Sequence, residues 1–221
     1  MTQKWKTDPT LYDCDVEEID GQVKKKLDYE NTYVKEFLDA DPLRDWESFD
    51  RCKDLWNWCM SKLENPDISK WRVMDCGTKD CQFPEWLLDK VEYAVGIEIS
   101  EPYVKYAQER NRPIIDVDVC DIEFTDESFD FMFAHHLLGL TQDFRKGLAE
   151  MYRVLKVGGF MVTLDNIPGN KRKHYSYVDS MDTVKEWLKG EDFEGHEILY
   201  FDRNPYNKDL VGEVILFMEK K

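Results

Sequence analysis

Short apolar runs alternate with amphipathic segments between Trp71 and Leu164. Five of these runs have the length and composition of buried strands, and they cover 72–75, 93–98, 113–117, 129–134 and 160–164. Apolar residues also recur at helical spacing over 83–88, 102–111 and 143–155, and Gly158-Gly159 is expected to stop the last helix. This alternation predicts an α/β fold in which helices cover both faces of a parallel sheet.

The C-terminal part of the chain has a different pattern. A short helix is predicted over 183–189, followed by strands over 196–201 and 213–218. The link between the two strands contains the turn-forming residues 204–207 and leaves no room for a crossover helix. We therefore expect these strands to pair as an antiparallel hairpin at one edge of the sheet.

Before the α/β pattern, residues 29–63 show helical spacing of apolar and aromatic residues. A helix is predicted over 31–39, and a second one begins near Asp41-Pro42 or Asp45 and ends at Asn65-Pro66. Residues 1–28 are polar, acidic and without periodicity, as in an extended arm. We expect residues 1–65 to form an arm and a helical lid, and residues 66–221 to form the main domain.

Acidic residues exceed basic ones by 46 to 30, which gives a formal net charge of −16. This charge opposes binding to phosphate backbones, so a nucleic-acid partner is disfavoured. The longest nearly apolar stretch, 131–140, is far shorter than a membrane span, and the N-terminus lacks the apolar core of a signal peptide. The sequence predicts a cytoplasmic protein without a membrane partner.

The six cysteines, at positions 14, 52, 59, 76, 81 and 120, include no CxxC pair. His174 and His196 lie far from all of them in the sequence, so the spacing of a zinc site is absent. We expect free, mostly buried thiols and no bound metal.

Acidic residues follow three consecutive predicted strands. Asp75 ends the first strand and is followed by Gly77 at a strand-to-helix turn, where open α/β sheets bind ligands. Glu98 ends the second strand, in the position where a carboxylate accepts hydrogen bonds from ribose hydroxyls. Asp121 follows the third strand, where it can accept a hydrogen bond from an adenine amino group. Three acids on one sheet edge predict a nucleoside site.

The order of motifs from Trp71 to Leu164 resembles a known family. The most specific stretch runs from Asp121-Ile122 through Ser128-Phe129-Asp130 and a following histidine to Glu150-x-x-Arg153-Val-Leu-Lys-Val-Gly-Gly. It is similar to the class I S-adenosylmethionine-dependent methyltransferases, particularly the small type-11-like group. The resemblance implies a Rossmann-like, doubly wound sheet, mostly parallel with an antiparallel C-terminal hairpin, plus N-terminal helices.

The resemblance also implies roles for individual residues. Asp75 and the backbone at Gly77 would face the methionine amino group and the ribose, Glu98 would bind the ribose hydroxyls, and Ile99 would pack on adenine. Asp121 and Ile122 would hold the adenine rim. Ala134 to His136 would line the methionine end and the acceptor pocket, and His135 and His136 are the candidates for a general base. Because neighbouring residues of an extended segment point to opposite sides, at most one of them should face the acceptor.

Two positions depart from the family pattern. The usual G-x-G-x-G turn reads Gly77-x-Lys79-x-Cys81, which places a side chain where helix and strand approach closely. This departure predicts either weakened cofactor binding or a reshaped turn. The family's Glu-His pair after the fourth strand is Gly139-Leu140.

The resemblance implies methyl transfer from S-adenosylmethionine, with S-adenosylhomocysteine as product, to a small molecule or to a protein. The chain lacks the Asn/Asp-Pro-Pro-Tyr/Phe run typical of amino-group methylation on bases or glutamine, and its acidity suits a neutral or cationic acceptor. Aromatic residues in 29–58, with Tyr33 among them, and in 175–177 are candidates for a lid. Two alternatives stay open. One is a catalytically weakened module that binds S-adenosylmethionine or a nucleoside and acts through a partner. The other is a different sulfonium-using enzyme, such as an aminopropyl transferase.

Overall fold

The computed structural model describes residues 46–138, 141, 143–166, 185–186, 188–190, 193–202 and 213–221. Their strands form one sheet in the order β3-β2-β1-β4-β5-β7-β6. The strands are β1 (Arg72–Cys76), β2 (Tyr93–Glu98), β3 (Ile114–Asp116), β4 (Phe129–His135), β5 (Leu155–Asn166), β6 (His196–Asp202) and β7 (Glu213–Lys220). The helices are α2 (Trp46–Lys62), α3 (Gln82–Leu87), α4 (Glu101–Gln108) and α5 (Phe144–Val154).

The first five strands pair in parallel, and the last two are antiparallel to them or to each other. β1 lies between β2 and β4, with Cys76 opposite Ile97 on one side and Ala134 on the other. β7 pairs with β5 and with β6 in antiparallel fashion. The doubly wound, mostly parallel sheet and its C-terminal antiparallel hairpin are therefore confirmed.

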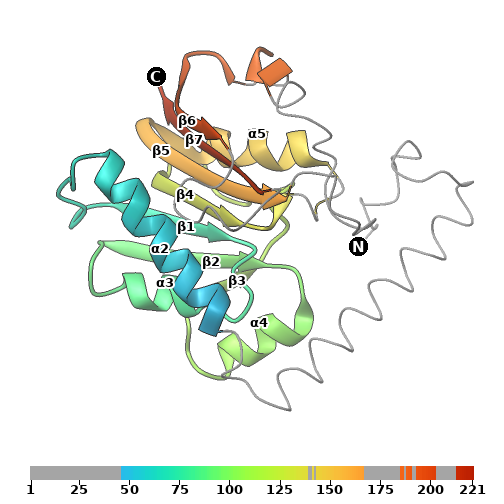
Figure 1. Cartoon of the computed structure of the whole chain (residues 1–221). Coiled ribbons are helices and arrows are strands. Elements are labelled where there is room, and N and C mark those ends of the chain that lie inside the picture. Colours follow the sequence, from blue (N-terminus) through green and yellow to red (C-terminus); the bar gives the residue numbers. More distant parts are fainter. Residues whose placement is uncertain are drawn as a thin grey trace, which may run out of the picture.

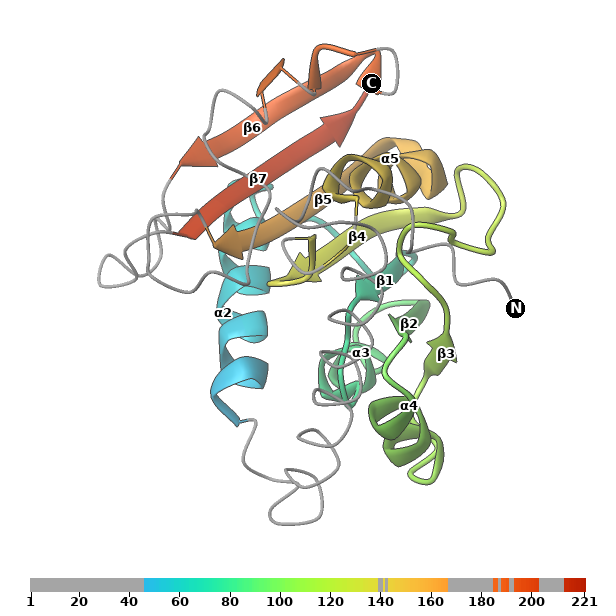
Figure 2. The ribbon, with the colours of Figure 1, turned by 90° about the vertical axis from the view of Figure 1, so that its right-hand side faces the viewer.

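α2 and α3 lie on one face of the sheet and α5 lies on the other (Figures 1 and 2). On the first face, Leu55, Trp56 and Cys59 of α2 and Phe83 and Leu87 of α3 pack on alternate residues of the central strands. The core on the other face is built around α5, whose apolar residues pack on the opposite side chains of the same strands. Side chains of a strand alternate between faces, so near-continuous apolar runs are what this two-sided burial requires.

The helix predicted over 143–155 corresponds to α5, and its end at Val154 lies within one residue of the prediction. The role of Gly158-Gly159 as the stop is wrong, because Leu155 is already extended, with φ −73° and ψ 135°. Leu155 pairs with Phe129, and the register then shifts before Phe160 pairs with Phe131. Gly158, at φ +75°, lies inside this irregular strand. Strand pairing thus ends the helix one turn before the glycines.

Several expectations fall outside the described residues. These are the helix over 31–39 with Tyr33, the arm at 1–28, Cys14, the Gly139-Leu140 pair and the aromatic residues at 175–177. The predicted helix at 183–189 is described only in part, with Lys185, Glu186 and Leu188 helical. The five cysteines within the described ranges are free and buried. No helix among the described segments has the length and apolar character to cross a membrane.

Candidate functional site

A hollow lies at the carboxyl end of β1, with an empty volume of about 370 Å³ that includes its opening to solvent. It is bounded by the turn after β1, by the end of β4 and by the first turns of α2 and α3. Its lining residues are Phe49, Cys52, Asp75, Gly77, Thr78, Lys79, Asp80, Gln82, Phe83 and His135. The hollow therefore combines apolar walls with three acidic or basic side chains and one imidazole.

Asp75 is the most deeply buried acid of this site, with 4% of its surface exposed. Its Oδ2 accepts a hydrogen bond from the Thr78 hydroxyl at 2.7 Å. Burial raises the pKa of Asp75 to about 7; Thr78 opposes the shift, and the carboxylates of Glu98 and Asp80 add to it. A cation bound in the hollow would stabilise the charged form of this buried carboxyl group.

Three residues of the turn after β1 have a backbone conformation that glycine adopts most easily. Gly77, Lys79 and Cys81 all lie in the left-handed region, with φ of +71°, +54° and +64°. Gly77 donates its N–H to Ile97 O at 2.9 Å, which fixes the turn to β2. Lys79 and Cys81 thus adopt a conformation that costs an L-residue on the order of 1–2 kcal/mol.

Glu98 connects this turn to the start of α4. Its Oε2 accepts the N–H of Lys79 at 3.0 Å, and its Oε1 accepts those of Ile99 and Ser100, each at 2.9 Å. Burial raises the pKa of Glu98, although these three N–H groups act in the opposite direction. An ionised carboxylate offers about four acceptor positions, so one remains on Oε2.

The two histidines after β4 have different surroundings. His135 lines the hollow, and its Nε2 is buried without a hydrogen-bond partner in the described part of the chain. Nε2 of His136 lies 3.2 Å from Nη2 of Arg51 on α2. Because a guanidinium only donates, His136 accepts this bond and carries its proton on Nδ1. Burial, together with His136, Arg51 and Lys79, lowers the pKa of His135 well below its usual value.

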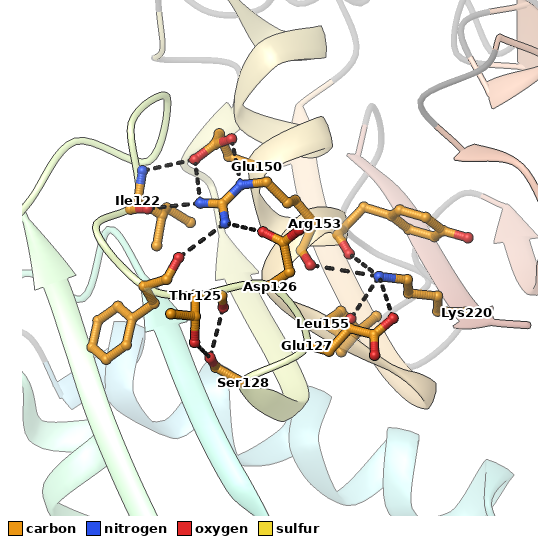
Figure 3. Close-up of polar contacts among 11 residues, drawn as sticks. Ile122, Thr125, Asp126, Glu127, Ser128, Glu150, Arg153, Leu155 and Lys220 are labelled. Carbon is orange, nitrogen blue, oxygen red and sulfur yellow. Dashed lines mark hydrogen bonds and ion pairs between the residues drawn. The ribbon is translucent and has the colours of Figure 1, made fainter.

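A polar network holds the loop after β3 (Figure 3). The carboxylate of Glu150 on α5 accepts the N–H of Ile122 at 2.9 Å. Arg153 donates to the carbonyls of Ile122 and Phe124 and to the carboxylates of Glu150 and Asp126, at 2.7 to 2.9 Å. The Glu-x-x-Arg pair that contributed to the family resemblance therefore fastens this loop to α5.

The C-terminal strand reaches the same region. Lys220 of β7 donates to the carbonyls of Tyr152 and Leu155, at 3.1 and 2.8 Å, where α5 ends. A cation at the carboxyl end of a helix interacts favourably with the helix dipole and with its unpaired carbonyls. The loop after β3, the end of α5 and β7 are thereby joined.

The remaining predicted residues lie around this framework. Asp121 is exposed beside the loop network, whereas Ile122 has its side chain in the core and its N–H bonded to Glu150. Ile99 is 59% exposed at the end of β2. Ala134 is fully buried and packs in the core on the α5 side, so its side chain does not line the hollow. Among the predicted residues, the hollow brings together Asp75, Gly77 and His135.

Sequence reasoning missed Gly96. A Cβ at this position in β2 would lie 2.4 Å from Cγ2 and 2.8 Å from Oγ1 of Thr78, so only glycine leaves room for the turn against β2. A glycine inside a predicted strand is a signal for such a close approach. Arg51 was also missed, and nothing in its local sequence distinguishes it from other helix-surface arginines.

Comparison with known proteins places this geometry in context. Residues 74–163 match the methyltransferase domain family. A demethylmenaquinone methyltransferase of Listeria welshimeri is 31% identical over 119 residues, which make up 46% of this chain and 48% of that protein. The chain spans about half the length of the curated relatives it matches.

Solved structures share the fold at low sequence identity. An S-adenosylmethionine-dependent methyltransferase from Mesorhizobium loti has a TM-score of 0.60 and 14% identity, over 75% of this chain and 97% of that one. The [4+2]-cyclase SpnF has a TM-score of 0.56 and 18% identity, over 74% and 80% of the two chains. The chain therefore has the fold of class I methyltransferases, and residues 74–163 match their domain family. S-adenosylmethionine is the cofactor of these enzymes.

Proposed function

We propose that this chain, whose residues 74–163 form a class I S-adenosylmethionine-dependent methyltransferase domain, transfers a methyl group to a small-molecule acceptor. The observation that carries the proposal is the turn after β1. Gly77, Lys79 and Cys81 all have a left-handed backbone, and the turn that they form lies beside a buried carboxyl group in a hollow.

The residues present fit the methionine end of the cofactor. Asp75 is buried in the hollow with a pKa of about 7, and a bound ammonium group would stabilise its charged form. Gly77 lines the hollow with its backbone, and a Cβ at this position would lie 2.6 Å from Cδ1 of Leu137, so the turn needs glycine here. We assign Asp75 to the amino group and the backbone at Gly77 to the adjoining part of the cofactor.

For the adenosine end, we assign Glu98, Ile99, Asp121 and Ile122. Glu98 has one acceptor position left on Oε2 for a ribose hydroxyl, since three backbone N–H groups take the others. Exposed Ile99 offers an apolar surface to the adenine ring, and exposed Asp121 offers an acceptor to its amino group. Ile122 contributes its backbone, provided that Glu150 releases its N–H. Ala134 contributes through its backbone alone.

When bound, S-adenosylmethionine supplies an electrophilic methyl group on its sulfonium. The chain then has to position the acceptor and exclude water, and any proton that the acceptor loses passes to solvent after methyl transfer. We assign the positioning to His135, because its Nε2 is buried in the wall of the hollow without a hydrogen-bond partner among the described residues. Its lowered pKa keeps it neutral, so Nε2 can accept a hydrogen bond from an O–H or N–H group of the acceptor. His136 instead positions α2 through Arg51.

We propose an acceptor that is small, largely apolar and equipped with one O–H or N–H group. The apolar walls contributed by Phe49, Cys52 and Phe83 support this class, as does the name of the Listeria relative, demethylmenaquinone methyltransferase. A protein acceptor is the second choice, and the net charge of −16 disfavours nucleic acid. We further propose that residues 1–65 supply the lid over residues 66–221, since Phe49 and Cys52 of α2 line the hollow. The cytoplasmic location stays a prediction.

A second candidate function uses the same fold without methyl transfer. The [4+2]-cyclase SpnF shares the fold, and here Lys79 and Cys81 stand where the family has glycine. A cofactor-binding module that acts through a partner, or another sulfonium-using enzyme, would have these features.

The two candidates are separated by incubating the full chain with S-adenosylmethionine labelled in its methyl group and a panel of quinols, phenols and amines. We expect label in a small-molecule product together with stoichiometric S-adenosylhomocysteine. Binding of the cofactor without label transfer to any member, or to added basic peptides, would favour the module.

A further inference from the structure

Two residues of the cofactor turn, Lys79 and Cys81, hold positive φ values that glycine would adopt without cost. An unfavourable backbone conformation persists only where surrounding contacts determine it. Glu98 supplies one such contact through Lys79 N. Local hydrogen bonds hold the far half of the turn: Gln82 Nε2 donates to Asp80 Oδ2 at 2.7 Å, and the N–H of Cys81 donates to Thr78 O at 3.0 Å. A further set of contacts joins this half of the turn to the segment before β3.

Arg112, in the segment that leads into β3, makes these contacts. Its Nη1 donates to the backbone carbonyl of Asp80 and to its Oδ2, each at 2.9 Å, and its Nε donates to Oε2 of Glu85 on α3 at 2.8 Å. The Arg112 and Asp80 side chains are 16% and 9% exposed. A guanidinium that bonds both the backbone and the side chain of one residue fixes its orientation, and a nearly buried pair is little screened by solvent.

The next residue along the chain completes the arrangement. The Cys81 thiol donates to the carbonyl of Pro113 at 3.2 Å, and the same carbonyl accepts the N–H of Gly96 in β2 at 2.7 Å. Burial raises the pKa of the Cys81 thiol, so it stays protonated and able to donate. The dipeptide Arg112-Pro113 thus holds both Asp80 and Cys81.

We propose that Arg112 is a positioning residue for the cofactor turn: it keeps the non-glycine turn in its glycine-like conformation and neutralises Asp80 at the wall of the hollow. Arg112 does not line the hollow, so it acts through Asp80 rather than by touching the ligand. The effect on cofactor binding rests on the proposed function, whereas the effect on the turn does not.

The test compares Arg112→Ala with Arg110→Ala in the full chain. Arg110 is a matched control, because it carries the same group two residues away but donates to the carbonyl of Tyr106 on α4 rather than to the turn. Hydrogen exchange of the peptide that covers 77–81 is measured without ligand, and S-adenosylhomocysteine binding is measured by calorimetry. We expect faster exchange of this peptide and about tenfold weaker binding for Arg112→Ala, with neither change for Arg110→Ala.

A second background separates positioning from general stability. In Lys79→Gly/Cys81→Gly, glycine adopts the turn unaided, so adding Arg112→Ala should lower affinity about threefold or less. An equal loss in both backgrounds, or unchanged exchange at 77–81 in the single variant, would overturn the proposal. If Arg112→Ala does not fold, Arg112→Lys takes its place. We then expect hydrogen exchange at 77–81 between that of the parent and full loss of protection, and exchange equal to that of the parent would overturn the proposal. If the parent chain itself fails to bind the ligand, the proposed function is wrong, and the exchange experiment still decides the role of Arg112.

Discussion

The Oε2 atom of Glu98 accepts the backbone N–H of Lys79 at 3.0 Å, so the acid at the end of β2 holds the turn at the end of β1. The other oxygen of the same carboxylate holds the start of α4 through Ile99 and Ser100. Glu98 therefore orders the walls of the site as well as offering an acceptor to a ribose. Its substitution should affect both.

Glu98→Ala should weaken S-adenosylhomocysteine binding by about 1–3 kcal/mol, because an acceptor for the ribose and the anchor of the turn are lost together. Calorimetry on Glu98→Ala and on Glu92→Ala, an exposed glutamate before β2, measures the difference. The affinity of Glu98→Gln should lie between those of the two alanine variants. The amide oxygen of glutamine can still accept a hydrogen bond, but its NH₂ group would face backbone N–H donors. Equal affinity of Glu98→Ala and the parent would contradict the ribose assignment.

Asp75 should make stability and binding depend on pH. Its pKa is about 7 in the folded chain against an ordinary value of 3.8, so the folded form holds the proton more tightly than the unfolded form. Stability that Asp75 contributes below pH 4 is lost as the pH rises towards 7, at up to about 1.4 kcal/mol per pH unit. Asp75→Asn has no carboxyl group and lacks this loss. The free energy of unfolding of the variant, relative to that of the parent, should therefore rise between pH 4 and 7 and stay constant above pH 7.

Urea denaturation of the parent and of Asp75→Asn from pH 5 to 8 measures this difference. S-adenosylhomocysteine binding by the parent should strengthen as the pH rises through 7, because the charged carboxylate is the form that pairs with an ammonium group. Parallel stability profiles for the two proteins would show that Asp75 has an ordinary pKa.

His135→Asn should lower the rate of methyl transfer about 100-fold and leave S-adenosylhomocysteine affinity nearly unchanged, because His135 is assigned to the acceptor. His196→Asn, in β6 at the far edge of the sheet, is the histidine control. Turnover and calorimetry on the two variants separate the effects. If His135→Asn transfers methyl groups at the rate of the parent, His135 has no role toward the acceptor and only packs in the wall of the hollow.

Arg153→Ala should destabilise the fold and loosen the loop after β3. It removes the donors of two backbone carbonyls, at Ile122 and Phe124, and leaves Glu150 without its cationic partner (Figure 3). Hydrogen bonds to charged groups contribute about 1.5–3 kcal/mol, and we expect a loss in this range from urea denaturation. Lys146→Ala, on the exposed side of α5, should change stability by less than about 0.5 kcal/mol. Similar values for the two variants would mean that the network adds nothing.

Gly96→Ala should destabilise the chain by about 1–3 kcal/mol, because the new Cβ would meet the Thr78 side chain at 2.4 Å and push it away from Asp75. Adding Thr78→Ser, which removes the closest methyl group and keeps the hydroxyl, should restore part of the loss. Thermal denaturation of the single and double variants checks this. If the stability changes of the two single variants simply add in the double variant, the contact between the two positions is absent.

The fold was predictable from local pattern, since buried strands and amphipathic helices leave a periodic signal in the sequence. The acids at the ends of β1 and β2 followed from the same pattern, because parallel strands end at one edge. The left-handed backbone at Lys79 and Cys81 was not predictable, since neither residue type favours it. Its supports are contacts distant in sequence, such as Arg112 with Asp80, and only the folded chain reveals them. The start of β5 at Leu155, where the sequence predicted a strand from 160, had the same cause, because Leu155 pairs with Phe129 of β4.

Binding of S-adenosylhomocysteine to the full chain, followed by titration calorimetry at pH 8, tests the central claim most directly. The account predicts one site with micromolar affinity, and clear weakening in Asp75→Asn. A folded parent chain that gives no binding heat with either S-adenosylhomocysteine or S-adenosylmethionine, at several temperatures, would contradict it.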